Sequence, residues 1–204
     1  MRIFRKTLVA SISLAAFVFI LPFELMQGVI TGMAGKHRFN LKFISEVYAE
    51  IFCSVDEAVQ IVLPGATDIK EEIKVLTAEQ KKLIQEKAGV DLDPEFGKDM
   101  HFYTSASGAA VVDTVKGKWG PIKYMLSFDA EGSIKDLVVL ELTERRGRPV
   151  RERKFLDQYI GKSTVDPIKL KKDIKGIGGA TISSRQMTDG IRKLVFTYAE
   201  LYRK

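Results

Sequence analysis

Residues 121–142 read PIKYMLSFDAEGSIKDLVVLEL, and this stretch decides the fold class. Large apolar residues take every second position from Ile122 to Phe128, which is typical of a half-buried strand. The sequence DAEG at 129–132 is a hairpin connection, and the Leu- and Val-rich run 134–142 is a second strand. The stretch therefore predicts a pair of antiparallel strands.

Sequence signals for two helices precede these strands. The sequences SVDE at 54–57 and TAEQ at 77–80 are capping boxes, each expected to open a helix. Pro64-Gly65 and Gly89 are the matching stop signals. After a loop rich in Asp, Pro and Gly, strand-like sequence begins near His101.

Two helices are expected after the hairpin. Phe155, Leu156, Tyr159 and Ile160 mark one face of a short helix that Gly161 ends. From 187 to 202, apolar residues recur three and four positions apart, which predicts an amphipathic helix of about five turns. We therefore expect a single α+β domain over residues 51–204, with an antiparallel sheet and a C-terminal helix.

The N-terminal segment has a different composition. Three basic residues within the first six precede an uncharged run from Thr7 to Phe23, and a second uncharged run covers 25–35. A basic start followed by an apolar run indicates a signal or signal-anchor helix. We expect residues 1–35 to anchor the chain in the cytoplasmic membrane, residues 36–50 to be a linker, and the domain to face the periplasm. Cleavage of the segment, and a buried core helix, are the alternatives.

Composition excludes several kinds of chemistry. The chain has 204 residues, a formal net charge of +6, two His and a single Cys. Two His and one Cys cannot build a four-ligand zinc site, and no CxxCH motif exists for c-type haem. No nucleophile–base pair stands out, so we name no catalytic residue and no metal ligand. Any chemistry must come from hydroxyls, carboxylates, amines or a borrowed cofactor.

The stretch KGIGGATISSR at 175–185 carries most of the functional information. Gly178 and Gly179 allow backbone conformations closed to other residues and let a ligand approach closely. Ala180 keeps that approach open. The stretch fits neither a Walker A pattern nor a dinucleotide-binding fingerprint.

Hydroxyl and basic residues follow these glycines. Thr181, Ser183 and Ser184 are expected at the N-terminus of the last helix, where N–H groups and the helix dipole attract a phosphate. Lys175 and Arg185 add positive charge nearby. The alternative is a Gly-rich turn in which one of the two serines only caps the helix.

This stretch resembles the flavinylation motif of the FMN-binding domain family, which includes flavin-carrying subunits of the Rnf and sodium-translocating NADH:quinone reductase complexes. The family pattern is Asp, two residues, Ser or Thr, then Gly-Ala-Thr, commonly followed by an aliphatic residue and two hydroxyl residues. The matching residues are Gly179, Ala180, Thr181, Ile182, Ser183 and Ser184. Lys175 replaces the Asp and Gly178 replaces the Ser or Thr.

The resemblance implies FMN as the cofactor, with its phosphate esterified to the hydroxyl of the motif threonine. It also implies a flavin transferase as the attaching partner and redox proteins of a membrane electron-transfer chain as further partners. Thr143 opens the loop that is rich in Thr, Pro and Gly in the redox complexes. The implied cofactor-binding residues are Thr143, Lys175, Gly178, Gly179, Ala180, Thr181, Ile182, Ser183, Ser184 and Arg185.

The resulting hypothesis is a membrane-anchored extracytoplasmic flavoprotein. Such a protein would carry electrons within a redox chain rather than act as a self-sufficient enzyme, because the redox chemistry belongs to the flavin. The alternative is a flavin-free binding module of the same fold, acting as an interaction partner at the membrane. The replacements at Lys175 and Gly178 are the reason to keep that alternative.

Three further features each have more than one interpretation. PGAT at 64–67 repeats Gly-Ala-Thr, but we interpret it as a helix stop. Trp119 and Tyr124 could stack on an isoalloxazine ring or belong to the core. Six basic residues between Arg145 and Lys154 form a solvated loop, a docking site for anionic headgroups or an acidic partner, or a source of positive potential near the flavin. Nucleic acid is not expected as a partner, because no aromatic residues interleave with these cations.

Overall fold

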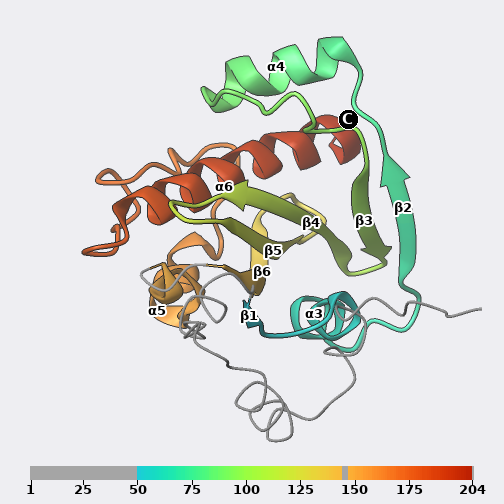
Figure 1. Ribbon diagram of the computed structural model, residues 1–204. Coiled ribbons are helices and arrows are strands. Elements are labelled where there is room, and N and C mark those ends of the chain that lie inside the picture. The colour runs from blue at the N-terminus through green and yellow to red at the C-terminus, as the bar shows by residue number, and fades with distance from the viewer. Residues whose placement is uncertain (1–49, 144–146, 204) are drawn as a thin grey trace, which may run out of the picture. The chain divides into compact units, whose positions relative to one another are not determined.

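The computed structural model describes residues 50–143 and 147–203, which form an α+β domain (Figure 1). Its six strands make one antiparallel sheet in the order β1-β6-β5-β4-β3-β2. The predicted fold class is therefore confirmed for this part of the chain. The strands are β1 (Glu50–Ile51), β2 (Lys70–Lys74), β3 (Met100–Ser105), β4 (Gly108–Lys116), β5 (Pro121–Phe128) and β6 (Ile134–Leu142).

The expected anchor, and all of the expected linker except Glu50, lie outside the described residues. Within the two described ranges, no helix combines the length and the apolar character that a membrane span requires. The anchor therefore stays a prediction.

Both predicted capping boxes are present. The Ser54 hydroxyl accepts a hydrogen bond from the Glu57 N–H at 3.2 Å, and Thr77 accepts one from the Gln80 N–H at 3.2 Å. Gly89 ends the second of these helices in the left-handed conformation, at φ 60°. The helices are α3 (Val55–Val62), α4 (Ala78–Ala88), α5 (Arg153–Leu156) and α6 (Thr181–Tyr202), with 3-10 turns η2 (Arg148–Arg151) and η3 (Asp157–Tyr159).

Helices cover both faces of the sheet, α6 on one and α3 on the other (Figure 1). In β5, Tyr124 and Leu126 pack in the core on the α6 side, while Met125 packs on the α3 side. Met125 and Ser127 are therefore fully buried, as are their alternating neighbours. The prediction of a half-buried strand is wrong, because α3 shields the face that the sequence pattern assigns to solvent.

Two other local predictions need correction. The segment expected as one short helix is a single α-helical turn followed by a 3-10 turn, and Ile160 is 42% exposed instead of facing the core. Strand β2 was not predicted at all. Its sequence, KEEIK, is dominated by charge, which is characteristic of edge strands that avoid pairing with other chains.

Helix α6 approaches the sheet closely at Gly190. A Cβ atom there would lie 2.5 Å from Val115 Cγ1 and 2.7 Å from the Tyr124 hydroxyl oxygen. The Tyr124 hydroxyl donates to Asp113 at 2.8 Å, and Lys193 of α6 forms an ion pair with the same carboxylate at 3.1 Å. Helix and sheet are thus joined by a close backbone approach and by a largely buried charge pair.

We predict that Gly190→Ala destabilises the domain. Overpacking costs about 1–3 kcal/mol, which outweighs the gain of about 1 kcal/mol in helix propensity. Urea unfolding should show a lower midpoint. Gly178→Ala is the matched control, since no atom lies within 4 Å of its added Cβ. An unchanged or raised midpoint for Gly190→Ala would contradict this packing.

Candidate functional site

The Gly-Ala-Thr stretch forms the N-terminal end of α6. Thr181 is the first helical residue, its side chain is exposed, and the helix has no side-chain cap at Ala180. The capping alternative for Ser183 or Ser184 is therefore wrong, because both lie within the first turn and are buried. The Ser184 hydroxyl instead donates to the Ala180 carbonyl at 2.9 Å and accepts from the Ile177 N–H at 3.2 Å.

A glycine turn leads into this helix end. Gly179 has φ 79°, a conformation that L side chains rarely adopt, and no atom lies within 4 Å of a Cβ placed on Gly178 or Gly179. The N–H of Ala180 donates to the Ile177 carbonyl at 3.1 Å, which closes the turn. Because the glycines face open space, a ligand can come close to the backbone ahead of Thr181.

Three segments surround a hollow of about 190 Å³ beside this turn. They are the β4–β5 turn, the loop after β6 and the start of α6. Trp119 is 65% exposed and Ile182 is 48% exposed, so the hollow has two apolar side chains open to solvent. Its lining consists of Lys118, Trp119, Gly147 and residues 179–183.

The structure separates the two aromatic candidates. Tyr124 is fully buried, and burial together with the nearby charge of Asp113 raises the pKa of its hydroxyl well above the usual value. Tyr124 therefore belongs to the core, whereas Trp119 lines the hollow. Lys118 also reaches this aromatic side chain, with its Nζ 5.0 Å from the centre of the Trp119 ring.

The other residues named from the sequence do not line the hollow. Gln158 holds Lys175 by the backbone, since its side chain accepts from the Lys175 N–H at 2.7 Å and donates to the Lys175 carbonyl at 3.2 Å. Arg185 is exposed, one turn further along α6. Thr143 packs against Gly120, where an added Cβ would lie 2.6 Å from the Thr143 Cβ.

Lys118 and Gly147 were missed by the sequence reasoning. Both lie in connections between elements, far from the Gly-Ala-Thr stretch in sequence, and only the folded sheet brings them to it. The run KGKWGP at 116–121, a tight connection with an aromatic residue at its centre, is the signal that could have identified Lys118.

The basic cluster has partners of its own. Arg148 pairs with Glu50 at 2.7 Å, and Arg153 pairs with Asp136 at 2.8 Å and with Asp157 at 2.6 Å. Arg145 and Arg146 lie outside the described residues. The paired cations fit the interpretation of a solvated loop, and such exposed pairs stabilise the fold little.

The second Gly-Ala-Thr, at 65–67, lies in a turn directly after α3, as expected of a helix stop. Asp173 lies two positions before the place of the family's Asp. Its side chain points toward the backbone of residues 168 and 169. Its carboxylate accepts hydrogen bonds from the N–H groups of Ile168 and Lys169 and pairs with Lys162 at 3.0 Å.

Residues 117–195 match the FMN-binding domain family. This part of the chain belongs to that family. The matched range begins at the β4–β5 turn and ends within α6, so it contains every residue that lines the hollow. FMN is accordingly the cofactor of the domain, and the match favours the flavin-binding hypothesis over the flavin-free module. No curated protein is similar enough to the chain to count as a match.

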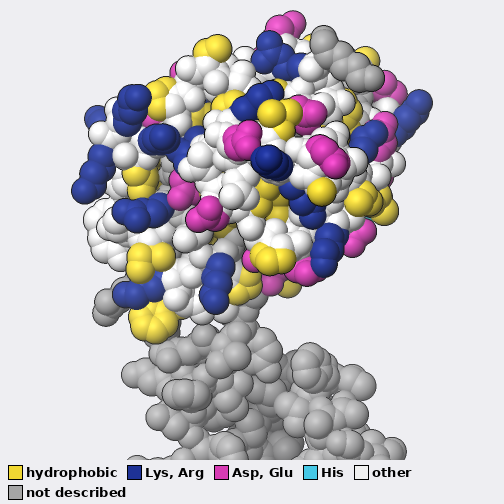
Figure 2. Space-filling model, turned by 90° about the horizontal axis from the view of Figure 1, so that it is seen from above, with side chains coloured by type: hydrophobic (Ala, Val, Ile, Leu, Met, Phe, Trp, Pro, Cys, Tyr) yellow, Lys and Arg dark blue, Asp and Glu magenta, His cyan; other side chains and the backbone are white. Residues whose placement is uncertain are grey.

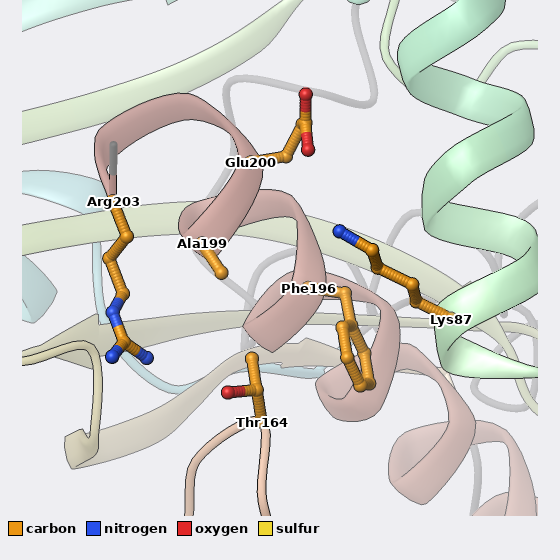
Figure 3. A pocket seen from close by; sticks show the side chains of 6 residues that line it. All are labelled: Lys87, Thr164, Phe196, Ala199, Glu200 and Arg203. Atoms are coloured by element: carbon orange, nitrogen blue, oxygen red, sulfur yellow. The ribbon is translucent and has the colours of Figure 1, made fainter.

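A larger hollow lies elsewhere on the domain (Figure 3). It measures about 520 Å³ and is bordered by Lys87 of α4, Phe196 and Glu200 of α6, and Thr164. A 22-residue helix is about 33 Å long, so this hollow near the C-terminal end of α6 is remote from Thr181. It is not part of the flavin site.

We predict that FMN quenches the fluorescence of Trp119, because a flavin ring bound in this hollow would stack on the indole. Trp119 is the single Trp of the chain, so its emission is an unambiguous reporter. Trp119→Ala should weaken FMN binding about 3- to 10-fold, the equivalent of one aromatic contact, whereas Trp119→Phe should retain most of the affinity. Titration of the protein with FMN measures both effects. Unchanged emission at saturating FMN would exclude Trp119 from the site.

Proposed function

We propose that the protein is a membrane-anchored extracytoplasmic electron carrier whose FMN is esterified to Thr181. One observation carries this proposal: an exposed threonine hydroxyl begins α6, between an open glycine turn and a hollow containing an exposed indole. All of these features lie within the range that matches the FMN-binding domain family.

The helix end is suited to the FMN phosphate. The N–H groups of the first helical turn have no carbonyl partner further back in the helix, and the dipole adds a partial positive charge there. Gly178 and Gly179 leave room for phosphate oxygens beside the backbone. Lys118, at the edge of the hollow, supplies a formal positive charge.

Covalent attachment needs a flavin donor and a partner enzyme. The Thr181 oxygen would form a bond to the FMN phosphorus of FAD as the pyrophosphate P–O bond breaks. AMP would leave, and the hydroxyl proton would pass to solvent. No oxidant is consumed, and a flavin transferase would catalyse the step. The exposure of Thr181 makes its hydroxyl accessible to such an enzyme.

Trp119 and Ile182 are suited to hold the isoalloxazine ring, which supplies the electron-transfer chemistry when FMN is bound. The hollow of about 190 Å³ is smaller than the roughly 300–1,000 Å³ of sites that enclose their ligand. Part of a bound flavin would therefore stay exposed, as electron exchange with another protein requires.

The proposed location rests on the basic and apolar N-terminal segment. Cations on the N-terminal side of an apolar run favour a cytoplasmic N-terminus and an exported domain. Redox proteins of a membrane electron-transfer chain would then be the partners of the flavin.

We predict that Thr181 is the attachment residue. Co-expression with a flavin transferase should give a flavin-fluorescent band after denaturing electrophoresis, in the membrane fraction, and Thr181→Ala should abolish it. Thr181→Ser should keep a labelled fraction, because the hydroxyl remains. Thr67→Ala is the matched control at the other Gly-Ala-Thr and should label fully. A labelled Thr181→Ala protein would refute the assignment.

We also predict that Lys175 and Gly178 limit covalent labelling. A Lys in place of the family's Asp should repel a divalent cation that accompanies FAD, yet it should attract the phosphate of bound FMN. Lys175→Asp with Gly178→Ser should raise the labelled fraction and weaken non-covalent FMN binding about threefold. Labelling rates and FMN dissociation constants at two salt concentrations provide the comparison. Full labelling of the unaltered protein, at a rate that the double substitution leaves unchanged, would show that neither residue is an obstacle.

A further inference from the structure

The loop over residues 168–174 presents three exposed lysines, Lys169, Lys171 and Lys172, which we term the lysine platform. Among the described residues, none of the three forms an ion pair, although the domain contains many such pairs elsewhere. Figure 2 shows Lys and Arg side chains crowding the left-hand end of the molecule, where α6 begins. The platform is therefore a cationic surface without an ion-pair partner among the described residues.

Buried residues hold this loop at both ends. Ile168 is 0% exposed and Ile174 is 1% exposed, so each anchors the loop in the core. The Asp173 carboxylate accepts from the N–H groups of Ile168 at 3.0 Å and Lys169 at 2.8 Å. Burial raises the pKa of Asp173, but these hydrogen bonds and Lys162 outweigh it and hold the pKa below its usual value. The carboxylate thus stays ionised, and its hydrogen bonds to the backbone hold the two ends of the loop together.

The loop backbone is also strained. Ile168 has φ 42° and Lys171 has φ 65°, in the left-handed region that β-branched and long side chains rarely adopt. The Arg192 guanidinium holds the first of these residues by donating to the Ile168 carbonyl at 3.2 Å. Strain of this kind persists only where the surrounding structure imposes it, and it is concentrated at functional sites. The structure therefore maintains a specific presentation of the three lysines.

The carboxylates around the loop form their hydrogen bonds and ion pairs with groups other than the three lysines. Asp166 accepts from the Ser163 N–H, and Asp189 pairs with Arg192 at 3.2 Å. Burial raises the pKa of Asp189 above its usual value, although the positive charges of Arg192, Arg185 and Lys169 oppose this shift. Asp189 thus offsets part of the charge of Lys169, whereas no carboxylate among the described residues forms an ion pair with Lys171 or Lys172.

The platform lies directly beside the glycine turn that leads to Thr181. A Cβ on Gly176 would lie 3.6 Å from Leu170 Cδ2 and 4.0 Å from Ser184 Cβ. The loop that carries the lysines therefore packs against the turn that leads to Thr181. A protein bound on the platform would lie beside the flavin.

We propose that the lysine platform docks the acidic face of a redox partner protein that exchanges electrons with the flavin. This inference rests on the proposed function as an electron carrier. Cationic patches raise the association rate of acidic partners and orient them on encounter. Lasting membrane contact usually adds apolar burial to charge attraction, and none of the exposed large apolar residues belongs to the loop 168–174, which favours a protein partner over a lipid surface.

Lysine footprinting tests docking independently of the flavin. The full-length protein, in neutral detergent, is acetylated with and without a plant-type iron–sulfur ferredoxin, a small acidic redox protein. Mass spectrometry should show protection of Lys169, Lys171 and Lys172, while Lys81 and Lys82 on α4 react as before. Equal reactivity of the platform with and without ferredoxin would refute the proposal. Protection of the platform by phosphatidylcholine vesicles containing phosphatidylglycerol, but not by ferredoxin, would identify a membrane contact instead.

Electron-transfer rates test the consequence for the flavin. In the FMN-loaded protein, the combined substitutions Lys169→Gln, Lys171→Asn and Lys172→Gln should lower the second-order rate with reduced ferredoxin about tenfold at low salt and remove most of its salt dependence. Asn is chosen at position 171 because it tolerates the left-handed conformation. The matched control, Lys81→Gln, Lys82→Gln and Lys87→Gln on α4, should change the rate less than twofold.

Two further results distinguish a failure of the docking proposal from a failure of the proposed electron-carrier function. With basic cytochrome c as the redox probe, the platform substitutions should leave the rate unchanged or raise it. An FMN-loaded protein that exchanges electrons with neither probe, yet shows ferredoxin protection of the platform, would refute the electron-carrier function and leave the docking surface standing. A ferredoxin rate that responds equally to the platform and α4 substitutions would refute the platform alone.

Discussion

The close contact between α6 and the sheet at Gly190 sets the position of the helix end that forms the candidate flavin site. Without a side chain at this position, the helix lies directly against Val115 and the Tyr124 hydroxyl, and the buried Lys193–Asp113 pair fixes its orientation. Nine residues earlier the helix begins at Thr181, about 13 Å away along the axis. The helix end and the β4–β5 turn consequently lie side by side, and the hollow lined by Trp119 forms between them.

The residues of this end of the domain divide into those that can contact a flavin and those that position them. Thr181, Ile182 and Trp119 present exposed groups to the hollow. Ser184 is buried and joins the glycine turn to the first helical turn. Gln158 similarly holds the backbone at Lys175. An exposed glycine turn is thus attached at both ends to the core, which leaves its backbone open to a ligand while holding its position.

Elements that depend on local interactions could be predicted from the sequence, and features that depend on distant contacts could not. The capping boxes at 54–57 and 77–80, the β5–β6 hairpin and the course of α6 follow from contacts within a few residues, and the structure confirms them. The half-buried β5 was wrong because the covering helix α3 is about sixty residues away in sequence. The charged edge strand β2 was missed because its residues carry no apolar pattern.

The sequence by itself indicated the cofactor family, because the Gly-Ala-Thr stretch before a helix is a short contiguous pattern whose resemblance to the FMN-binding domain family can be seen without the fold. Only the tertiary structure decided which other groups accompany Thr181. It buried Tyr124 and brought Lys118, Trp119 and Gly147 to the helix end, since strand pairing and helix packing join positions that the chain separates by more than thirty residues. Which residues line a binding site built from several loops depends on the whole fold. A local sequence pattern does not show it.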